Sequence, residues 1–239
     1  MNKSTENTEE IRKYFDQLNL YKKIVDHNYM AHREIYAEMK KFLHNSSARN
    51  FTLCDAGCGD ASSISKILHG SRISKYIGID LSPFALEKAN ENISSLNCDA
   101  EFLEGDIINY LAQLKKQSID IFVAGFSVHH FQDQEKRFFF EQCHRILTST
   151  GYLLFCDVFR RSSESRDDYL HHYFTNSDAY WTALPEPEIK ALKKHVTSYD
   201  FPTNIEEITE IASNAGFRKN PILLFSDSPG FHRLYVFSA

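Results

Sequence analysis

The ten-residue stretch Phe51–Asp60, which reads F-T-L-C-D-A-G-C-G-D, limits what this chain can fold into more than any other. An apolar run ends there in the carboxylate of Asp55 and the glycines Gly57 and Gly59, and a helical pattern follows. A buried strand, a tight turn and a helix produce this order, because glycine lets the backbone turn sharply and approach a ligand closely. In doubly wound sheets, a nucleotide-like ligand lies at this first crossing from strand to helix.

Two features of the turn distinguish between ligands. The dinucleotide fingerprint G-x-G-x-x-G needs a third glycine where this chain has Ser62. The carboxylate of Asp55 would repel a pyrophosphate, whereas it can accept a hydrogen bond from an ammonium group. The turn therefore favours a cationic ligand that carries an amino acid over NAD.

The pattern D-x-G-x-G at Asp55–Gly59 resembles the first motif of the class I S-adenosylmethionine (SAM)-dependent methyltransferases. The resemblance implies that SAM is the cofactor, that S-adenosylhomocysteine (SAH) is the product, and that this turn lines the methionine end of SAM. It also implies an N-terminal helical segment over the cofactor, where Arg33 could meet its carboxylate or could equally lie on a solvated helix face. The expected cofactor-binding residues are Tyr29, Arg33, Asp55, Ala56, Gly57, Cys58, Gly59, Asp80, Leu81, Ser82, Gly105, Asp106, Ile107 and Phe126.

Asp80 is the best supported of these positions. It ends the predicted second strand, Lys75–Asp80, 21 positions beyond Gly59. An acid about 20 residues after the glycine turn can bind both ribose hydroxyls. Ser82 and Pro83 then open a helix, as N-cap and first helical residue.

A third acid, Asp106, follows the short predicted strand Ala100–Leu103. In the methyltransferase pattern, an acid here reaches the adenine amino group, and Asp106 supplies the acceptor that such an amine needs. Asp106 could also cap the predicted helix Ile107–Leu114. Both roles can coexist.

The predicted fourth strand, Ile119–Ala124, leads into G-F-S-V-H-H-F. This segment resembles that of small-molecule methyltransferases and differs from the N-P-P-Y type found in many enzymes that methylate nucleic acids. A general base is needed only if the acceptor arrives protonated, and His129 and His130 are the candidates because histidine titrates near neutral pH. We expect one of the two to face the pocket, with His130 favoured. Either could equally be a packed structural histidine.

Asp157 ends the predicted fifth strand, beside the expected methyl-transfer site, and could orient that histidine or take the proton itself. The next segment, 159–202, is long for a connection and contains the only tryptophan, Trp181. We expect two or three helices that form a lid over a small, partly flat substrate. The lid aromatics could instead serve only to attach the lid to the core.

The complete pattern predicts an α/β fold: a Rossmann-like, doubly wound sheet of seven strands, mostly parallel, whose last hairpin is antiparallel. We expect a single methyltransferase domain with a helical N-terminal cap at 1–48, helical over 8–44, and a cofactor-binding core at 49–158. The lid would follow at 159–202, and a C-terminal helix and hairpin at 203–239. Thr203 should cap that helix, with Glu206 completing a capping box.

Composition limits the classes of partner that this protein is expected to bind. A formal net charge of −5 argues against a nucleic-acid partner, and no apolar run is long enough to span a membrane. The N-terminus lacks a signal-peptide pattern, and the five cysteines lack C-x-x-C spacing, so we expect a reduced, cytoplasmic protein. We expect no metal, since the pair His171-His172 lacks the spacing that places two ligands on one helix face. The expected partner is a small-molecule methyl acceptor, and the expected state is a monomer or homodimer.

Two alternatives from other classes share parts of this pattern. A non-catalytic sensor or partner subunit would keep the SAM site but would have no need of an acceptor pocket. An NAD-dependent reductase would share the glycine turn and Asp80.

Overall fold

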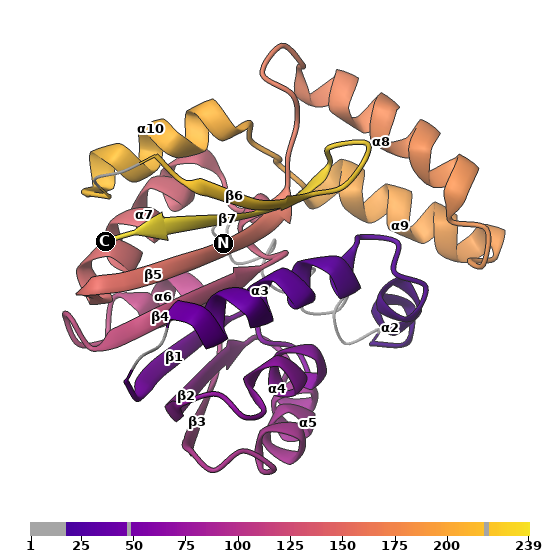
Figure 1. The fold of residues 1–239 in the computed structure, drawn as a ribbon. Helices are drawn as coiled ribbons and strands as arrows, with labels where there is room; N and C mark the ends of the chain where they lie inside the picture. Colours follow the sequence, from indigo (N-terminus) through magenta and orange to yellow (C-terminus); the bar gives the residue numbers. More distant parts are fainter. Residues whose placement is uncertain (1–17, 47–48, 218–219) are drawn as a thin grey trace.

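Seven strands form one sheet at the centre of the molecule (Figure 1). The computed structural model describes residues 18–46, 49–217 and 220–239. The strands are β1 (Phe51–Ala56), β2 (Ile73–Asp80), β3 (Asp99–Glu104), β4 (Ile119–Gly125), β5 (Leu147–Val158), β6 (Ile222–Ser226) and β7 (His232–Ser238). The helices are α2 (Leu18–Asp26), α3 (His32–Ser46), α4 (Ser62–Leu68), α5 (Pro83–Ile93), α6 (Ile107–Leu111), α7 (Asp133–Ile146), α8 (Arg166–Tyr180), α9 (Glu186–Tyr199) and α10 (Ile205–Ala215), with the short 3-10 helix η1 (Val128–His130).

The order of the strands in the sheet is β3-β2-β1-β4-β5-β7-β6. The pairs formed by β1 to β5 are parallel, whereas β7 is antiparallel to both β5 and β6. Helices connect β1 to β5, and such crossovers bring strands back in parallel, while the short β6–β7 loop makes a hairpin. The predicted fold class is confirmed. The chain reverses its winding direction between β1 and β4, and ligands of doubly wound sheets bind beyond the carboxyl ends of strands at such a point.

Helices cover both faces of the sheet. Phe140 of α7 and Ile211 of α10 belong to the apolar cluster on one face, which α6 also joins. Met39 of α3 and Leu86 of α5 belong to the cluster on the other face, with α4. Because both faces are covered, a central strand such as β4 has a continuous apolar run, Ile121–Ala124, and its Phe122 is fully buried.

The described part of the N-terminal segment consists of two helices, α2 and α3. Between α2 and α3 the backbone adopts positive φ at Asn28 (58°) and Ala31 (55°), which a helix does not allow. The expected helix over 8–44 is therefore interrupted here, and its portion before residue 18 lies outside the described residues.

Helices α8 and α9 form the predicted insertion after β5 and lie near the edge of the sheet where β4 and β5 end (Figure 1). Their aromatic side chains are largely internal. Tyr173 and Trp181 pack with Ile24 of α2 and with Phe231 of the β6–β7 loop in a third apolar cluster. These aromatics attach the insertion to the rest of the molecule. We call α8, α9 and the residues that link and follow them, 166–201, the lid.

The start of α10 corrects one prediction. Its N-cap is Asn204, whose side-chain oxygen accepts a hydrogen bond from the Glu207 backbone N–H (2.8 Å). The expected cap and capping box of Thr203 and Glu206 are wrong by one residue, because Thr203 is extended and bridges to Phe159 instead. Gly216 ends the helix in the left-handed conformation (φ 111°), as its position predicts. Among the described helices, none has the length and apolar character that a membrane crossing requires.

Candidate active site

The glycine turn links the end of β1 to α4. Gly57 and Gly59 both adopt positive φ (72° and 54°), which favours glycine. A Cβ at Gly57 would lie 3.1 Å from Cβ of Ser127, whereas no atom of the residues that the structure describes lies within 4 Å of the Cβ position at Gly59. The turn is held to β2 by the backbone N–H groups of Gly57 and Cys58, which donate to the Ile79 carbonyl (2.8 and 3.1 Å). The space beside Gly59 is thus open to a ligand.

Asp80 joins two turns at the end of β2. Its Oδ2 accepts a hydrogen bond from the Gly59 N–H (2.8 Å) and its Oδ1 from the Ser82 N–H (2.9 Å). Ser82 caps α5 with Pro83 in its first turn, as predicted, and Leu81 lies between acid and cap. A carboxylate with two oxygens can accept several hydrogen bonds, including bonds from hydroxyl groups.

Asp55 lies at the end of β1 and is only 6% exposed. It accepts a hydrogen bond from the Tyr76 hydroxyl (2.9 Å). Burial raises the pKa of Asp55 to about 7, and the neighbouring charge of Asp80 adds to the rise. An ammonium group placed beside Asp55 would stabilise its charged form.

Asp55→Asn is expected to remove a pH dependence of stability. Since the fold raises the pKa of Asp55 to about 7, its stabilising contribution is complete below its unfolded pKa and is lost as the pH rises through the folded value. Without SAM, the wild-type chain should lose roughly 2–3 kcal/mol of unfolding free energy relative to the variant between pH 5 and pH 8. Urea unfolding of both proteins measures this difference, and parallel pH profiles would contradict the assignment.

The turn that follows β3 adds further residues to the site. Asp106 caps α6 by accepting from the Asn109 N–H (3.2 Å), so its predicted capping role is confirmed. Burial raises the pKa of Asp106. Gly105 donates its N–H to the Asp80 carbonyl (2.9 Å), and Ile107 is buried 3.8 Å from the Cβ position of Gly57. The ends of β1, β2 and β3 therefore lie together, with one acid on each.

Other predicted cofactor contacts lie further along the same edge. Phe126 follows β4 with a positive φ of 51°, and its buried ring lies 4.9 Å from that of His32. Tyr29 stacks on Trp181 of the lid at 5.0 Å, and its hydroxyl accepts from the Ala183 N–H. The guanidinium of Arg33 donates to the Asp26 carbonyl (2.6 Å). The contacts of Tyr29 and Arg33 are thus with the lid and the α2–α3 turn, and their binding of SAM stays a prediction.

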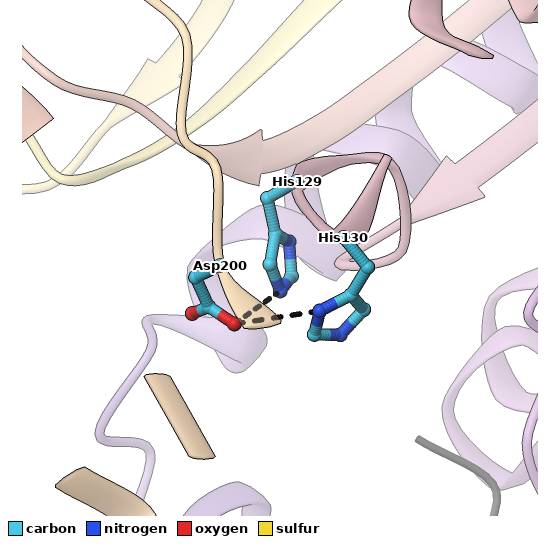
Figure 2. Close-up of side chains that lie close together, drawn as sticks. All are labelled: His129, His130 and Asp200. Atoms are coloured by element: carbon cyan, nitrogen blue, oxygen red, sulfur yellow. Dashed lines mark ion pairs between the residues drawn. The ribbon is translucent and has the colours of Figure 1, made fainter. Parts of the chain in front are cut away.

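The two histidines after β4 are buried together in η1. The ring centroids of His129 and His130 are 4.0 Å apart. Asp157 accepts from the His129 backbone N–H (2.9 Å) and also hydrogen-bonds to its Nδ1. Of the two histidines, it is therefore His129 that Asp157 orients. Both rings approach Asp200, which follows α9, rather than diverging (Figure 2).

Asp200 and His195 are site residues that the sequence did not indicate. Oδ1 of Asp200 lies 3.4 Å from Nδ1 of His130, 3.8 Å from Nε2 of His129 and 3.9 Å from Nε2 of His195. They reach the end of β4 only because the lid folds back on the sheet. Neither residue has a spacing or motif that marks it.

Burial and charge act against each other in this cluster. Burial lowers the pKa of His129, but the carboxylates of Asp157 and Asp200 outweigh burial, so its pKa is raised. The pKa of His130 is lowered by burial and by the adjacent His129. Burial likewise lowers the pKa of His195 to about 3. The imidazoles of His130 and His195 are therefore neutral at pH 7.

A sequence profile of the family described as methyltransferase domain matches residues 47–216, more than two thirds of the chain. The match begins just before β1 and ends just after α10, so it covers the glycine turn, the three acids and the lid. The chain belongs to this family and is a class I SAM-dependent methyltransferase. Membership implies SAM as cofactor and decides against the NAD-dependent reductase.

The chain is similar to several known proteins. The carboxy-S-adenosyl-L-methionine synthase of Campylobacter jejuni is 22% identical over 173 residues, which are 71% of this chain and 70% of that protein. A SAM-dependent methyltransferase from Archaeoglobus fulgidus superposes with a TM-score of 0.61 at 12% identity, covering 90% of this chain and 99% of that one. A Nostoc punctiforme protein, provisionally assigned as an O-methyltransferase, gives a TM-score of 0.61 at 14% identity and covers 88% of this chain. The present chain spans only 57% of the Nostoc protein.

Proposed function

We propose that this enzyme transfers the methyl group of SAM directly to a small-molecule acceptor and releases SAH. The observation that carries the proposal is the lid over the carboxyl ends of β4 and β5. The Phe201 N–H, just after α9, donates to the His129 carbonyl (2.7 Å), and the Tyr173 hydroxyl of α8 lies 3.3 Å from Nε2 of His232. An acceptor held beneath two such helices is a small molecule rather than a nucleic acid or a membrane surface. The net charge of −5 supports the same choice.

The residues at the strand ends fit SAM. Asp80 places a carboxylate, the acceptor that ribose hydroxyls need, at the end of β2, and the space beside Gly59 is open. Asp55 is a buried acid, and an ammonium group beside it would stabilise its charged form. SAM supplies a methyl group on a sulfonium, which the acceptor atom displaces directly. The task of the protein is therefore to align the two reactants and to exclude water.

A proton must leave an acceptor that arrives as an alcohol, phenol or ammonium. The sequence assigns that proton to His130, His129 or Asp157, and this assignment stays a prediction. Location in the cytoplasm and the monomeric or homodimeric state stay predictions as well.

Incubation with methyl-labelled SAM and pools of small metabolites tests the proposal. We expect label in a low-molecular-weight product, with one SAH formed for each product molecule. Label only in RNA or protein would contradict the small-molecule acceptor. SAM binding without SAH release from any pool would instead support the non-catalytic sensor. A carboxylated SAM would point to the product that the name of the Campylobacter relative describes.

A further inference from the structure

Two segments distant in sequence bring metal-ligating side chains to one buried point. His129 and His130 come from η1 after β4, and Asp200 comes from the end of the lid (Figure 2). One potential ligand atom of each lies within 4.8 Å of those of the other two. All three residues are at most 7% exposed.

The separations within this cluster suit a shared ion. Ligand atoms bound at about 2.0–2.2 Å in a tetrahedral site lie about 3.3–3.6 Å from one another. The Asp200 Oδ1 lies 3.4 Å from the nearer histidine nitrogen, on His130, and 3.8 Å from that of His129. Nε2 of His195 is 3.9 Å from the same oxygen, but His195 is not one of the three residues whose ligand atoms all lie within 4.8 Å of one another.

The hydrogen bonds around the cluster leave these atoms facing each other. Oδ1 of Asp200 is buried and makes no hydrogen bond to the residues that the structure describes. Nδ1 of His130 lies 3.3 Å from the Tyr199 carbonyl and 3.4 Å from this oxygen, and it can bind an ion in the tautomer that carries the ring proton on Nε2. Nδ1 of His129 is paired with Asp157, which leaves Nε2 turned toward Asp200. A carboxylate on the second ring nitrogen is the usual support of a metal-binding histidine.

We propose that His129, His130 and Asp200 bind one divalent transition-metal ion, Zn²⁺. Two imidazole nitrogens and one carboxylate oxygen suit Zn²⁺, whereas Mg²⁺ and Ca²⁺ require mostly oxygen ligands. The ion joins the loop after β4 to the end of the lid and so fixes the lid over the acceptor region. A His130 nitrogen that binds the ion cannot also take a proton from the methyl acceptor. Metal binding is therefore proposed in place of the general-base role for His130.

Metal binding can be measured without reference to methyl transfer. EDTA-treated wild-type protein should take up one equivalent of Zn²⁺ with a Kd below about 1 µM. A 100-fold excess over Kd should raise the thermal midpoint by about 5 °C or more, and Mg²⁺ should not substitute. Co²⁺ bound to the wild-type protein should show the visible absorption bands of a nitrogen-and-oxygen site, and Zn²⁺ should abolish them.

The variants Asp200→Asn and His130→Gln should each weaken Zn²⁺ binding at least 10-fold. His171→Gln is the matched control, because this histidine is exposed on α8 and lies outside the cluster. It should bind Zn²⁺ as the wild-type chain does. Wild-type protein that takes up neither Zn²⁺ nor Co²⁺, or binding that survives both ligand substitutions, would overturn the proposal. SAM affinity measured without metal keeps this result separate from the proposed function.

Discussion

Asp80→Ala is expected to weaken SAM binding at least 100-fold. The substitution removes a carboxylate that would accept two hydrogen bonds from the ribose, each worth about 1.5–3 kcal/mol when the acceptor is charged. It also removes the acceptor for the Gly59 and Ser82 N–H groups, so two turns at the site lose their link. Titration calorimetry of the wild-type and variant proteins measures the loss.

Glu101→Ala provides the control for this substitution. Glu101 is an acid on the adjacent strand β3, but it is exposed and pairs with Lys75 (2.7 Å). Surface ion pairs of this kind contribute little, so its SAM affinity should match that of the wild-type chain. The SAM affinity of Asp80→Asn should fall between those of Asp80→Ala and Glu101→Ala, because its amide oxygen can still accept a hydrogen bond. An Asp80→Ala variant that binds SAM within threefold of the wild-type affinity would remove Asp80 from the site.

Trp181→Ala is expected to lower the unfolding free energy by about 3–5 kcal/mol, the usual range for a buried aromatic residue replaced by alanine. Trp181 is 4% exposed, stacks on Tyr29 and packs edge-on against Tyr173 at 6.1 Å. It therefore holds the lid to the N-terminal segment. The thermal midpoint should fall by roughly 10 °C, as calorimetry can measure.

The neighbouring Tyr180 is the matched control, since it is aromatic but 70% exposed. Tyr180→Ala should change the midpoint by no more than about 2 °C. If Trp181→Ala and Tyr180→Ala change the thermal midpoint by the same amount, the apolar cluster around Trp181 does not hold the lid in place.

The core of the fold could be predicted because its signals are local. The glycine turn, the acid 21 positions later and the Ser82 cap each depend on residues close in sequence or on one fixed spacing. The apolar run Ile121–Ala124 of β4 follows from burial on both faces of the sheet. The boundary of α10 depends on a tertiary contact: Thr203 bridges to Phe159, so Asn204 rather than Thr203 caps the helix.

The acceptor side of the site could not be predicted in the same way. His129 was found from its place after an apolar strand, but its partner Asp200 is 71 positions away, on a lid without a repeating pattern. Tyr29 was assigned to the cofactor from its position in the N-terminal segment, yet its ring stacks on Trp181. Contacts between segments this far apart depend on how the lid packs, which residue spacing does not record.

The central claim is that acids at the ends of three adjacent parallel strands hold SAM. A crystal structure of the chain with SAH tests it most directly. The account predicts the ribose hydroxyls within hydrogen-bonding distance of Asp80, the adenine near Asp106 and the amino-acid end beside Gly57 and Asp55. SAH bound elsewhere, or bound with Asp55 and Asp80 turned away from it, would contradict the account.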